Sequence, residues 1–386
     1  MKFEANRLTP TPERDRRAEL DTLLDLIRSR KQAYQDAGQI DDETVEAMKA
    51  AGVYRALVPQ RFGGDECSPS DFLRLIEEIS IVDGSAGWVA SFGVSHTYLA
   101  SLPEATLEQI YANGPDVVFA GGLFPPQPAE IVDGGYIVSG RWSFGSGSPG
   151  AALIGVGVKG GEETGGLPLT AVMPADQVEI VPNWDVIGMR GTGSYDMKVD
   201  GVFVSSEWTF VRGSAASIDV PIFRYPSMAL AAQVLAVVGL GVARAALNQL
   251  TAMATKRASI TGAQLMAERA HVQIELAKAE AELRSARAFF YEATDEAFAE
   301  VLREGKASRE QVGIVRLAAT NAAKVGADVA RAAFAQAGTA GIFNAHPLSR
   351  FMQDAAVVSQ HAFLTEGTWQ SAGQCLLGLP TPAGYP

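Results

Sequence analysis

Four histidines are the side chains best suited to proton transfer in this sequence, because an unperturbed imidazole changes its charge near neutral pH. They are His96, His271, His346 and His361. None forms an H-x-x-x-H pair or stands with carboxylates at the spacing of metal ligands, so no metal site is expected. Isolated histidines of this kind serve either acid–base chemistry or packing, and the spacing alone leaves both roles open.

Two glycine-rich loops are further candidates for a binding site. In the stretch Trp142-Ser-Phe144-Gly-Ser146-Gly-Ser148, aromatic rings stand beside small hydroxyls, which suits a planar ligand with hydrogen-bonding edges. The alternative is a strand that ends in a serine–glycine turn. The stretch 188–193 holds three glycines, which indicates positive φ angles or close approach of a ligand, or simply a tight turn.

Motifs of nicotinamide-dependent enzymes, serine hydrolases, nucleotide hydrolases and redox cysteine pairs are absent or incomplete in this sequence. Gly155-Val-Gly157-Val-Lys-Gly160 matches the dinucleotide pattern G-x-G-x-x-G, but a turn-like sequence follows where a helix must start, so a hairpin is favoured over a nicotinamide site. The sequence contains no G-x-S-x-G elbow or P-loop. Its two cysteines, Cys67 and Cys375, are far apart and offer no disulfide framework or C-x-x-C pair, which fits a reducing cytoplasm.

The hydrophobic pattern divides the chain into three regions that would position these residues. Helical spacing predicts a helical domain over 1–115, with Asp41 or Asp42 as a helix cap, and β-branched runs between glycines predict an antiparallel β domain over 116–215. Long helices return over 216–386, where an apolar seam at 4-3-4 spacing predicts a bundle. Two further helices are expected over about 309–336 and 347–377.

The charge and the hydropathy of the chain argue against nucleic acid and membrane as partners. A net charge of −12 and no basic run argue against nucleic acid. The N-terminus is charged and lacks the apolar stretch of a secretory signal. No residue between Arg224 and Arg244 is charged, but glycines and polar residues interrupt this segment, so a buried bundle helix is favoured over a membrane span. We therefore expect a cytoplasmic protein.

A series of short motifs, taken in order, resembles the acyl-CoA dehydrogenase superfamily along nearly the whole chain. The motifs are Leu57-Val-Pro59-Gln-Arg-Phe-Gly63-Gly64, Trp184 to Asp196, Arg257-Ala-Ser-Ile260, Gln336-Ala-Gly338-Thr339-Ala-Gly341, and Pro347-Leu-Ser-Arg350-Phe-Met-Gln-Asp354. The resemblance implies an α+β, mostly α fold, with an N-terminal α domain, a central antiparallel β domain and a C-terminal four-helix bundle. It also implies a homotetramer that binds flavin between the β domain and the bundle.

The spacing around Asp354 separates two branches of this superfamily. In many dehydrogenases a glutamate base follows that aspartate by eight residues, whereas Glu366 follows it by twelve. In a continuous helix the difference is one turn, about 6 Å, which is too far for a base that must touch a substrate carbon. His361 stands close to the position of the dehydrogenase base instead.

Other residues resemble the flavin-dependent monooxygenase branch, in particular the oxygenase components of hydroxyphenylacetate hydroxylase and hydroxy-steroid hydroxylase. The similar segments are 140–147, 85–96 and 359–361. The resemblance implies that Ser146 bonds the flavin near N5, that His361 assists proton movement over its reactive face, and that His96 binds or deprotonates the substrate, unless His96 only packs in its helical layer. It implies flavin contacts from Trp142, Phe144, Ser146, Ser148, Arg257, Gln336, Gly338 and Thr339; His271 and His346 are expected to be structural.

The predicted function is the oxygenase component of a two-component flavin-dependent monooxygenase. It would take reduced FMN or FAD from a separate reductase, and diffusion of the flavin between the two proteins would be enough. It would hydroxylate a small aromatic or heteroaromatic substrate with O2 through a C4a-hydroperoxyflavin. The loop 121–128 lacks the threonine with which dehydrogenases hold oxidised flavin, which suits a flavin that diffuses in reduced. Two alternatives are an acyl-CoA dehydrogenase with Glu366 as base and a non-catalytic flavin-binding or scaffold member.

Overall fold

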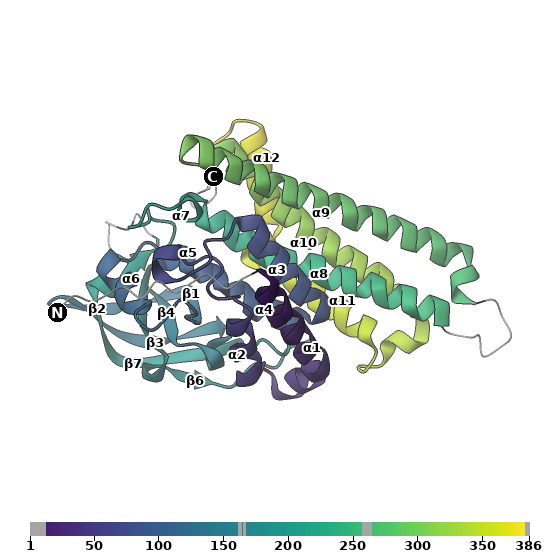
Figure 1. Ribbon diagram of the computed structural model, residues 1–386, viewed down its shortest axis with the longest axis horizontal. Coiled ribbons are helices and arrows are strands. Elements are labelled where there is room, and N and C mark those ends of the chain that lie inside the picture. Colours follow the sequence, from purple (N-terminus) through teal and green to yellow (C-terminus); the bar gives the residue numbers. More distant parts are fainter. Residues whose placement is uncertain (1–12, 161–163, 165–166, 257–264, 383–386) are drawn as a thin grey trace. The chain divides into compact units, whose positions relative to one another are not determined.

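The computed structural model describes residues 13–160, 164, 167–256 and 265–382 (Figure 1). It is 59% helical with two small sheets, as the α+β, mostly α prediction requires. Its described residues fall into two compact units: one comprises those up to Phe72 with 92–185 and 191–227, and the other comprises 73–91, 186–190 and those from Met228 onward. The three domain boundaries drawn from the sequence stay a prediction.

From Glu13 onward, where the description of the chain begins, the first helical region contains six α-helices. They are α1 (Glu13–Ala37), α2 (Asp42–Ala50), α3 (Pro69–Val82), α4 (Gly84–Ser91), α5 (His96–Leu99) and α6 (Glu104–Ile110). Asp41 caps α2 as predicted, because its side chain accepts a hydrogen bond from the Thr44 N–H, one of the donors that a helix start leaves unpaired. Residues of α5 and α6 belong to the first unit, and those of α4 belong to the second.

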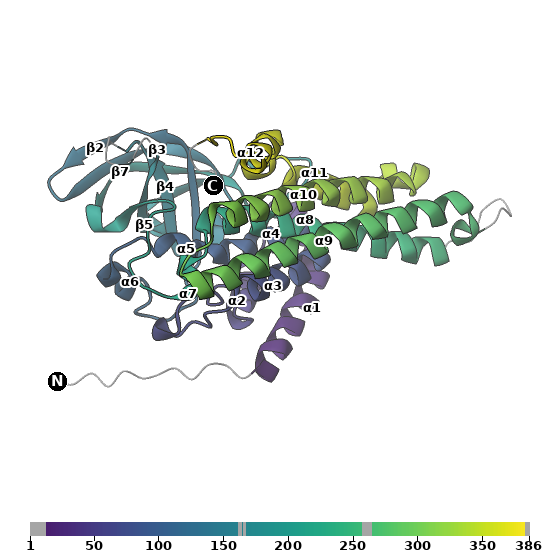
Figure 2. The same ribbon diagram turned by 90° about the horizontal axis from the view of Figure 1, so that it is seen from above.

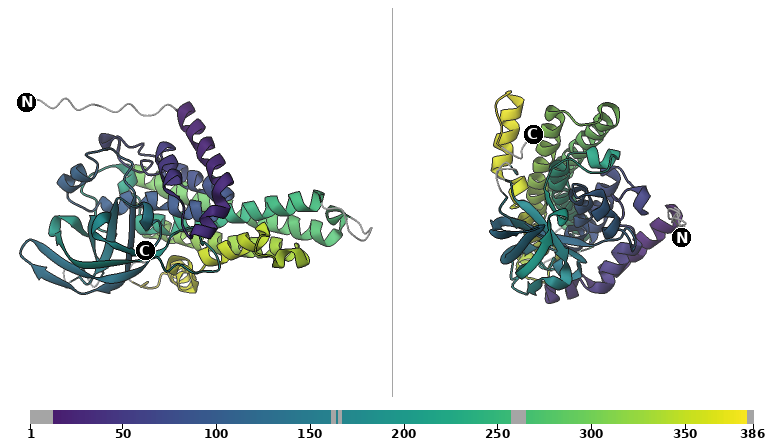
Figure 3. Two further views of the ribbon diagram at one scale, coloured as in Figure 1. Left: turned by 90° about the horizontal axis from the view of Figure 1, so that it is seen from below. Right: turned by 90° about the vertical axis from the view of Figure 1, so that its left-hand side faces the viewer.

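Among the described residues of the first unit, eight strands form two four-stranded sheets. The strands are β1 (Phe119–Gln127), β2 (Ala129–Val132), β3 (Gly135–Gly145), β4 (Leu153–Val158), β5 (Leu169–Pro174), β6 (Glu179–Val181), β7 (Tyr195–Ser205) and β8 (Thr209–Val211). Their orders are β1-β4-β5-β8 and β2-β3-β7-β6. Buried residues of both sheets share one apolar core. The strands of the two sheets, coloured blue to teal, lie together in Figure 3. The segment 155–157 is an interior part of β4, as the hairpin interpretation predicted.

One strand pair departs from the predicted antiparallel arrangement, because β1 runs parallel to β4. The intervening hairpin of β2 and β3 belongs to the other sheet, so the chain returns to β1 by a crossover rather than a tight turn. The end of β3, where the candidate binding loop begins, pairs with β7 in the second sheet.

The second unit is built on three long helices, α8 (Ser227–Lys256), α9 (Ala270–Glu304) and α10 (Arg309–Ala335), which run side by side in Figure 2; the short α7 (Pro221–Arg224) precedes α8. A Cβ atom at Gly326 of α10 would lie 2.8 Å from the Gly239 carbonyl oxygen of α8, so these helices need glycine where they touch. The apolar window of α8 is 94% buried, which identifies it as a core helix.

The predicted helix over 347–377 is wrong as a continuous element. The structure has α11 (Pro347–Val358), a 3-10 turn η9 (Ala362–Leu364) and α12 (Glu366–Leu376). The break has a local cause, because the His361 side chain accepts a hydrogen bond from the Phe363 N–H and so caps η9. His361 therefore lies in a turn between two helices.

Candidate active site

The residues predicted for the site fall into both units. In the first unit, Ser146 follows β3 and is buried. Its hydroxyl lies 2.6 Å from that of Ser194, which lies 2.6 Å from the Thr192 hydroxyl. Three buried hydroxyls thus form a chain in which each can donate or accept. Such a chain presents an adjustable proton or lone pair to a ligand at the Ser146 end.

The same loop carries an unsatisfied polar atom and a strained residue. Ser148 is 2% exposed, and its hydroxyl has no hydrogen-bond partner among the described residues. Phe144 has φ of +66°, unusual for an aromatic residue, yet it is 68% exposed, and its ring and that of Trp184 meet edge-on. A buried unpaired hydroxyl and a strained exposed ring typically mark functional sites.

Trp142 does not offer a ring face as the sequence analysis expected. Its side chain has no accessible surface, belongs to the shared core of the sheets, and donates its indole N–H to the Gly157 carbonyl at 2.8 Å. Inward and outward positions alternate along a strand, and Trp142 occupies an inward one. Its place suits a residue that fixes β3 rather than one that touches a cofactor.

His96, also in the first unit, is completely buried. Its Nδ1 lies 2.8 Å from the Tyr111 hydroxyl, whereas Nε2 has no hydrogen-bond partner in the part of the chain that the structure describes. Burial lowers the pKa of His96 to about 4, although the carbonyl groups of Tyr54 and Val117 act in the opposite direction. His96 is therefore neutral at physiological pH. Sequence reasoning missed Tyr111, because it lies fifteen residues away in the chain.

His361 lies in the second unit among aromatic rings. Its ring centroid is 6.0 Å from that of Trp88 on α4 and 5.1 Å from that of Phe363. Because Nδ1 accepts the Phe363 N–H, a neutral His361 carries its proton on Nε2. The guanidinium of the buried Arg316 on α10 stands 5.5 Å from the Phe363 ring. Phe363 and Arg316 were not foreseen, since only the fold brings α10 to this turn.

The structure corrects the argument that placed Glu366 one helical turn away. That displacement assumed a continuous helix from Asp354 to Glu366, but α11 ends at Val358. Glu366 is instead the exposed first residue of α12. There its negative charge is stabilised by the partial positive charge at the N-terminal end of the helix. His361, and not Glu366, is the residue held by aromatic neighbours.

A buried ionic network supports the turn that carries His361. Asp354 on α11 accepts a hydrogen bond from the Met189 N–H at 2.6 Å, and Arg350 lies between the carboxylates of Asp354 and Asp83. Met189 has φ of +56°, and a Cβ atom at Gly188 would lie 2.5 Å from the Gln353 carbonyl oxygen. The glycine of this loop is thus required by close helix contact rather than by a ligand.

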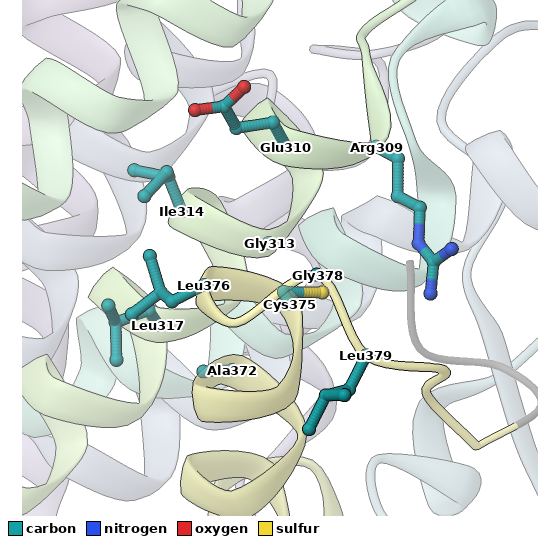
Figure 4. Close-up of a pocket in the computed structure, with 10 residues that line it drawn as sticks. All are labelled: Arg309, Glu310, Gly313, Ile314, Leu317, Ala372, Cys375, Leu376, Gly378 and Leu379. Atoms are coloured by element: carbon teal, nitrogen blue, oxygen red, sulfur yellow. The ribbon is translucent and has the colours of Figure 1, made fainter.

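The remaining predicted cofactor contacts are only partly described. Gln336 caps the C-terminal end of α10, and Gly338 and Thr339 are exposed in the 3-10 turn η8 (Gly338–Ile342). Arg257 lies outside the described residues. A cavity of about 410 Å³ between α10 and α12 (Figure 4) is lined by residues such as Gly313, Leu317 and Leu376, and neither His361 nor Phe363 is among them.

The loop after β3 fits a flavin. An isoalloxazine ring is planar and carries nitrogen and oxygen atoms on its edge, so it needs apolar contact on its face and hydroxyl partners at its rim. The exposed ring of Phe144, the unpaired Ser148 hydroxyl and the chain that starts at Ser146 supply those contacts. In the second unit, the capped and neutral His361 has an Nε2–H that can donate a hydrogen bond.

Comparisons with known proteins agree with this chemistry. Residues 20–109 match the family described as acyl-CoA dehydrogenase, N-terminal domain, and residues 233–366 match acyl-CoA dehydrogenase, C-terminal domain. The chain is 51% identical to indole-3-acetate monooxygenase of Pseudomonas putida, over 95% of each chain. It is 33% identical to the oxygenase subunit HsaA, a flavin-dependent monooxygenase of Mycobacterium tuberculosis, over 54% of this chain and 56% of HsaA.

Solved structures give the same picture. The crystal structure of 3-HSA hydroxylase from Rhodococcus sp. RHA1 superposes with a TM-score of 0.89 at 25% identity, covering 96% of this chain and 99% of the other. The likeness extends over both helical regions and the strands between them.

Proposed function

Because this chain belongs to the acyl-CoA dehydrogenase family, among its flavin-dependent monooxygenases, we propose that its substrate is an indole-type aromatic acid, with indole-3-acetate as the model compound. The chain is the oxygenase component, which uses reduced flavin and works with a separate reductase. The observation that carries the proposed substrate is the 51% identity, over nearly both whole chains, to a protein named for indole-3-acetate.

The reaction balances as follows. Bound reduced flavin supplies two electrons to O2; one oxygen atom enters a C–H bond of the aromatic ring as a hydroxyl, and the other leaves as water after taking up two protons. The protein's task is to hold the flavin, orient the aromatic ring, exclude water and manage protons. A reductase that delivers flavin by diffusion suffices for the supply of electrons.

The residues of the first unit are proposed to hold the flavin. Ser146 would bond its edge near N5, with Ser194 and Thr192 behind it to adjust the direction of the hydroxyl proton. Ser148 would use its unpaired hydroxyl on the same edge, and Phe144 would cover part of the ring face. Trp142 would fix the strand beneath this loop. From the family motifs, Arg257, Gln336, Gly338 and Thr339 are proposed as further flavin contacts.

His361 and His96 are proposed to act on protons and substrate. The turn at η9 fixes Nδ1 of His361 as an acceptor, so Nε2–H of the neutral ring is the group that would donate a hydrogen bond toward the reacting oxygen. Trp88 and Phe363 limit how its ring can tilt. His96 is neutral, and from the family resemblance it is proposed to bind the substrate.

Two further properties are part of the proposal. Ile342 and Phe343 are exposed beside η8, 72% and 67% respectively, which supports an interface between copies of the chain and hence a homotetramer. The acidic net charge and the buried α8 support a cytoplasmic protein without nucleic acid or membrane as partner.

The direct test supplies the purified chain with chemically reduced FMN or FAD, ¹⁸O2 and indole-3-acetate. We expect a product that carries one ¹⁸O atom per molecule and less hydrogen peroxide than the flavin consumed. Flavin oxidised to peroxide in full, with no labelled product from any aromatic acid, would overturn the proposed activity. Labelled product from 4-hydroxyphenylacetate but none from indole-3-acetate would overturn the indole substrate alone.

A further inference from the structure

Three arginines line one cavity in the second unit, where α3 meets α8 and α9. The cavity has a volume of about 370 Å³, and its wall includes Arg74 of α3, Arg244 of α8 and Arg287 of α9. α3 and α8 touch beside it, because a Cβ atom at Gly241 would lie 2.9 Å from the Glu77 carbonyl oxygen. The arginines therefore stand on helices whose spacing is set by close packing.

Two of these arginines already hold a carboxylate. Arg287 donates from Nε and Nη2 to the two carboxylate oxygens of the buried Glu77, at 2.7 and 2.9 Å, and the Tyr291 hydroxyl donates to the same carboxylate at 2.8 Å. Arg244 donates to both oxygens of Glu280, at 2.7 and 3.1 Å. A guanidinium has five N–H donors, so Arg244 and Arg287 each keep donors that these carboxylates do not use.

Arg74 is the third cation, and among the described residues no carboxylate forms an ion pair with it. Its guanidinium carbon lies 4.2 Å from the centre of the Tyr291 ring, and the guanidinium carbon of Arg287 lies 4.7 Å from the same centre. An aromatic face attracts a cation but has no net charge that could cancel it. An anion in this cavity would therefore be attracted by a guanidinium group that the described protein leaves unneutralised.

The charges around the cavity leave one positive charge in excess. Three arginines and the two carboxylates of Glu77 and Glu78 line it. Beside it, Glu280 and Arg284 pair with each other and add one charge of each sign. This excess stands out in a chain whose net charge is −12. Apolar side chains complete the wall, namely Ile81, Leu240 and Leu283.

We propose that this cavity binds a small monocarboxylate with an apolar body. Its carboxylate lies among the guanidinium groups of Arg74, Arg244 and Arg287, and its body lies on the apolar wall. A single carboxylate matches the single positive charge in excess, and guanidinium N–H groups bond carboxylate oxygens in pairs. Small-molecule sites measure about 300–1,000 Å³, so a cavity near the lower limit fits a small ligand. None of its lining residues belongs to the candidate active site, so the site does not depend on the proposed function.

Isothermal titration calorimetry of the purified full chain with hexanoate tests this site. Hexan-1-ol is the probe without a charge, and inorganic phosphate is the probe without an apolar body. We expect hexanoate to bind one site per chain and the other two probes to bind about tenfold more weakly, because each lacks one half of the contacts. The proposal is overturned if hexanoate does not bind at millimolar concentration, or if phosphate or hexan-1-ol binds as tightly.

Arg74→Gln and Arg284→Gln form a matched pair of variants. Each removes one positive charge from the same group of helices, but only Arg74 lines the cavity, and Arg284 is exposed outside it. Hexanoate should bind about tenfold more weakly to R74Q, which loses a charged hydrogen-bond donor. It should bind to R284Q within about twofold of the wild type, because solvent and salt screen an exposed distant charge. Equal weakening in both variants would show that hexanoate responds to overall charge and would overturn the contact with Arg74.

Thermal unfolding of the wild type is a second measurement that needs no variant. A ligand that binds only the folded chain stabilises it by mass action, so the melting temperature should rise with hexanoate concentration and should rise less with hexan-1-ol or phosphate. A melting temperature that hexanoate leaves unchanged or lowers would contradict the site. Neither experiment uses flavin or turnover, so failure of the proposed monooxygenase substrate would leave both results valid.

Discussion

The buried His96 should make the protein less stable as the solution becomes acidic, and the size of the effect follows from its pKa. That pKa falls from 6.5 to about 4 in the folded chain because of burial. Between these values the unfolded chain binds a proton that the folded chain does not, so stability is present at neutral pH and is lost as the pH falls through 6.5 toward 4. At about 1.4 kcal/mol per pH unit, the limit is about 3.4 kcal/mol.

The perturbation that isolates this effect is His96→Gln, which removes the titrating group. We expect the free energy of unfolding of the wild type, relative to H96Q, to decrease by about 2 kcal/mol between pH 7 and pH 5. Urea titrations at several pH values in that range measure it, and carboxylates common to both proteins cancel in the difference. Tyr34→Phe is a control that keeps His96. Its free energy of unfolding, relative to that of H96Q, should decrease by the same amount over this pH range.

A difference between wild type and H96Q that stays constant within about 0.5 kcal/mol over this range would refute the reasoning. It would mean that the imidazole gains a proton in the folded protein as easily as in the unfolded chain. The burial of His96 and its neutral pairing with Tyr111 would then both be wrong.

Asp354 should change stability in the opposite direction, because burial raises the pKa of its carboxyl to about 6. Relative to Asp354→Asn, the wild type should gain up to about 3 kcal/mol of stability as the pH falls from 7 to 4. A gain in relative stability as the pH rises would contradict this. Trp142→Phe should cost about 1–3 kcal/mol in urea titrations, because the buried Gly157 carbonyl loses its donor, and an unchanged midpoint would show that water replaces it. Glu366→Gln should leave kcat with indole-3-acetate within about twofold, because this carboxylate is exposed at the start of α12; a loss above a hundredfold would restore Glu366 as a base.

The sequence by itself determined the succession of elements. Periodic burial follows from side-chain spacing, so five of the six predicted seam residues of α9 are buried (Val272, Ala279, Leu283, Ala286 and Phe290). The Asp41 cap and the turn at Gly134 also depend on a few neighbouring residues. The family motifs added the superfamily and its monooxygenase branch, because they record contacts that one periodicity cannot.

Only the tertiary structure decided how the candidate residues are surrounded. Trp142 and Phe144 are two residues apart and would face the same side of a regular strand, yet one is fully buried and the other mostly exposed. The reason is local, because φ turns positive at Phe144 and the pairing with β7 shifts register between Trp142 and Gly145. The break after Val358 depends on one side-chain hydrogen bond of His361, which helical periodicity does not encode.

The partners of both histidines are likewise tertiary facts. Tyr111 meets His96 across fifteen residues, and Trp88 meets His361 across more than half the chain. Residue type gave each histidine the capacity to carry a proton near neutral pH. Burial keeps His96 neutral, and in His361 the hydrogen bond that Nδ1 accepts from the Phe363 N–H places the proton of the neutral ring on Nε2.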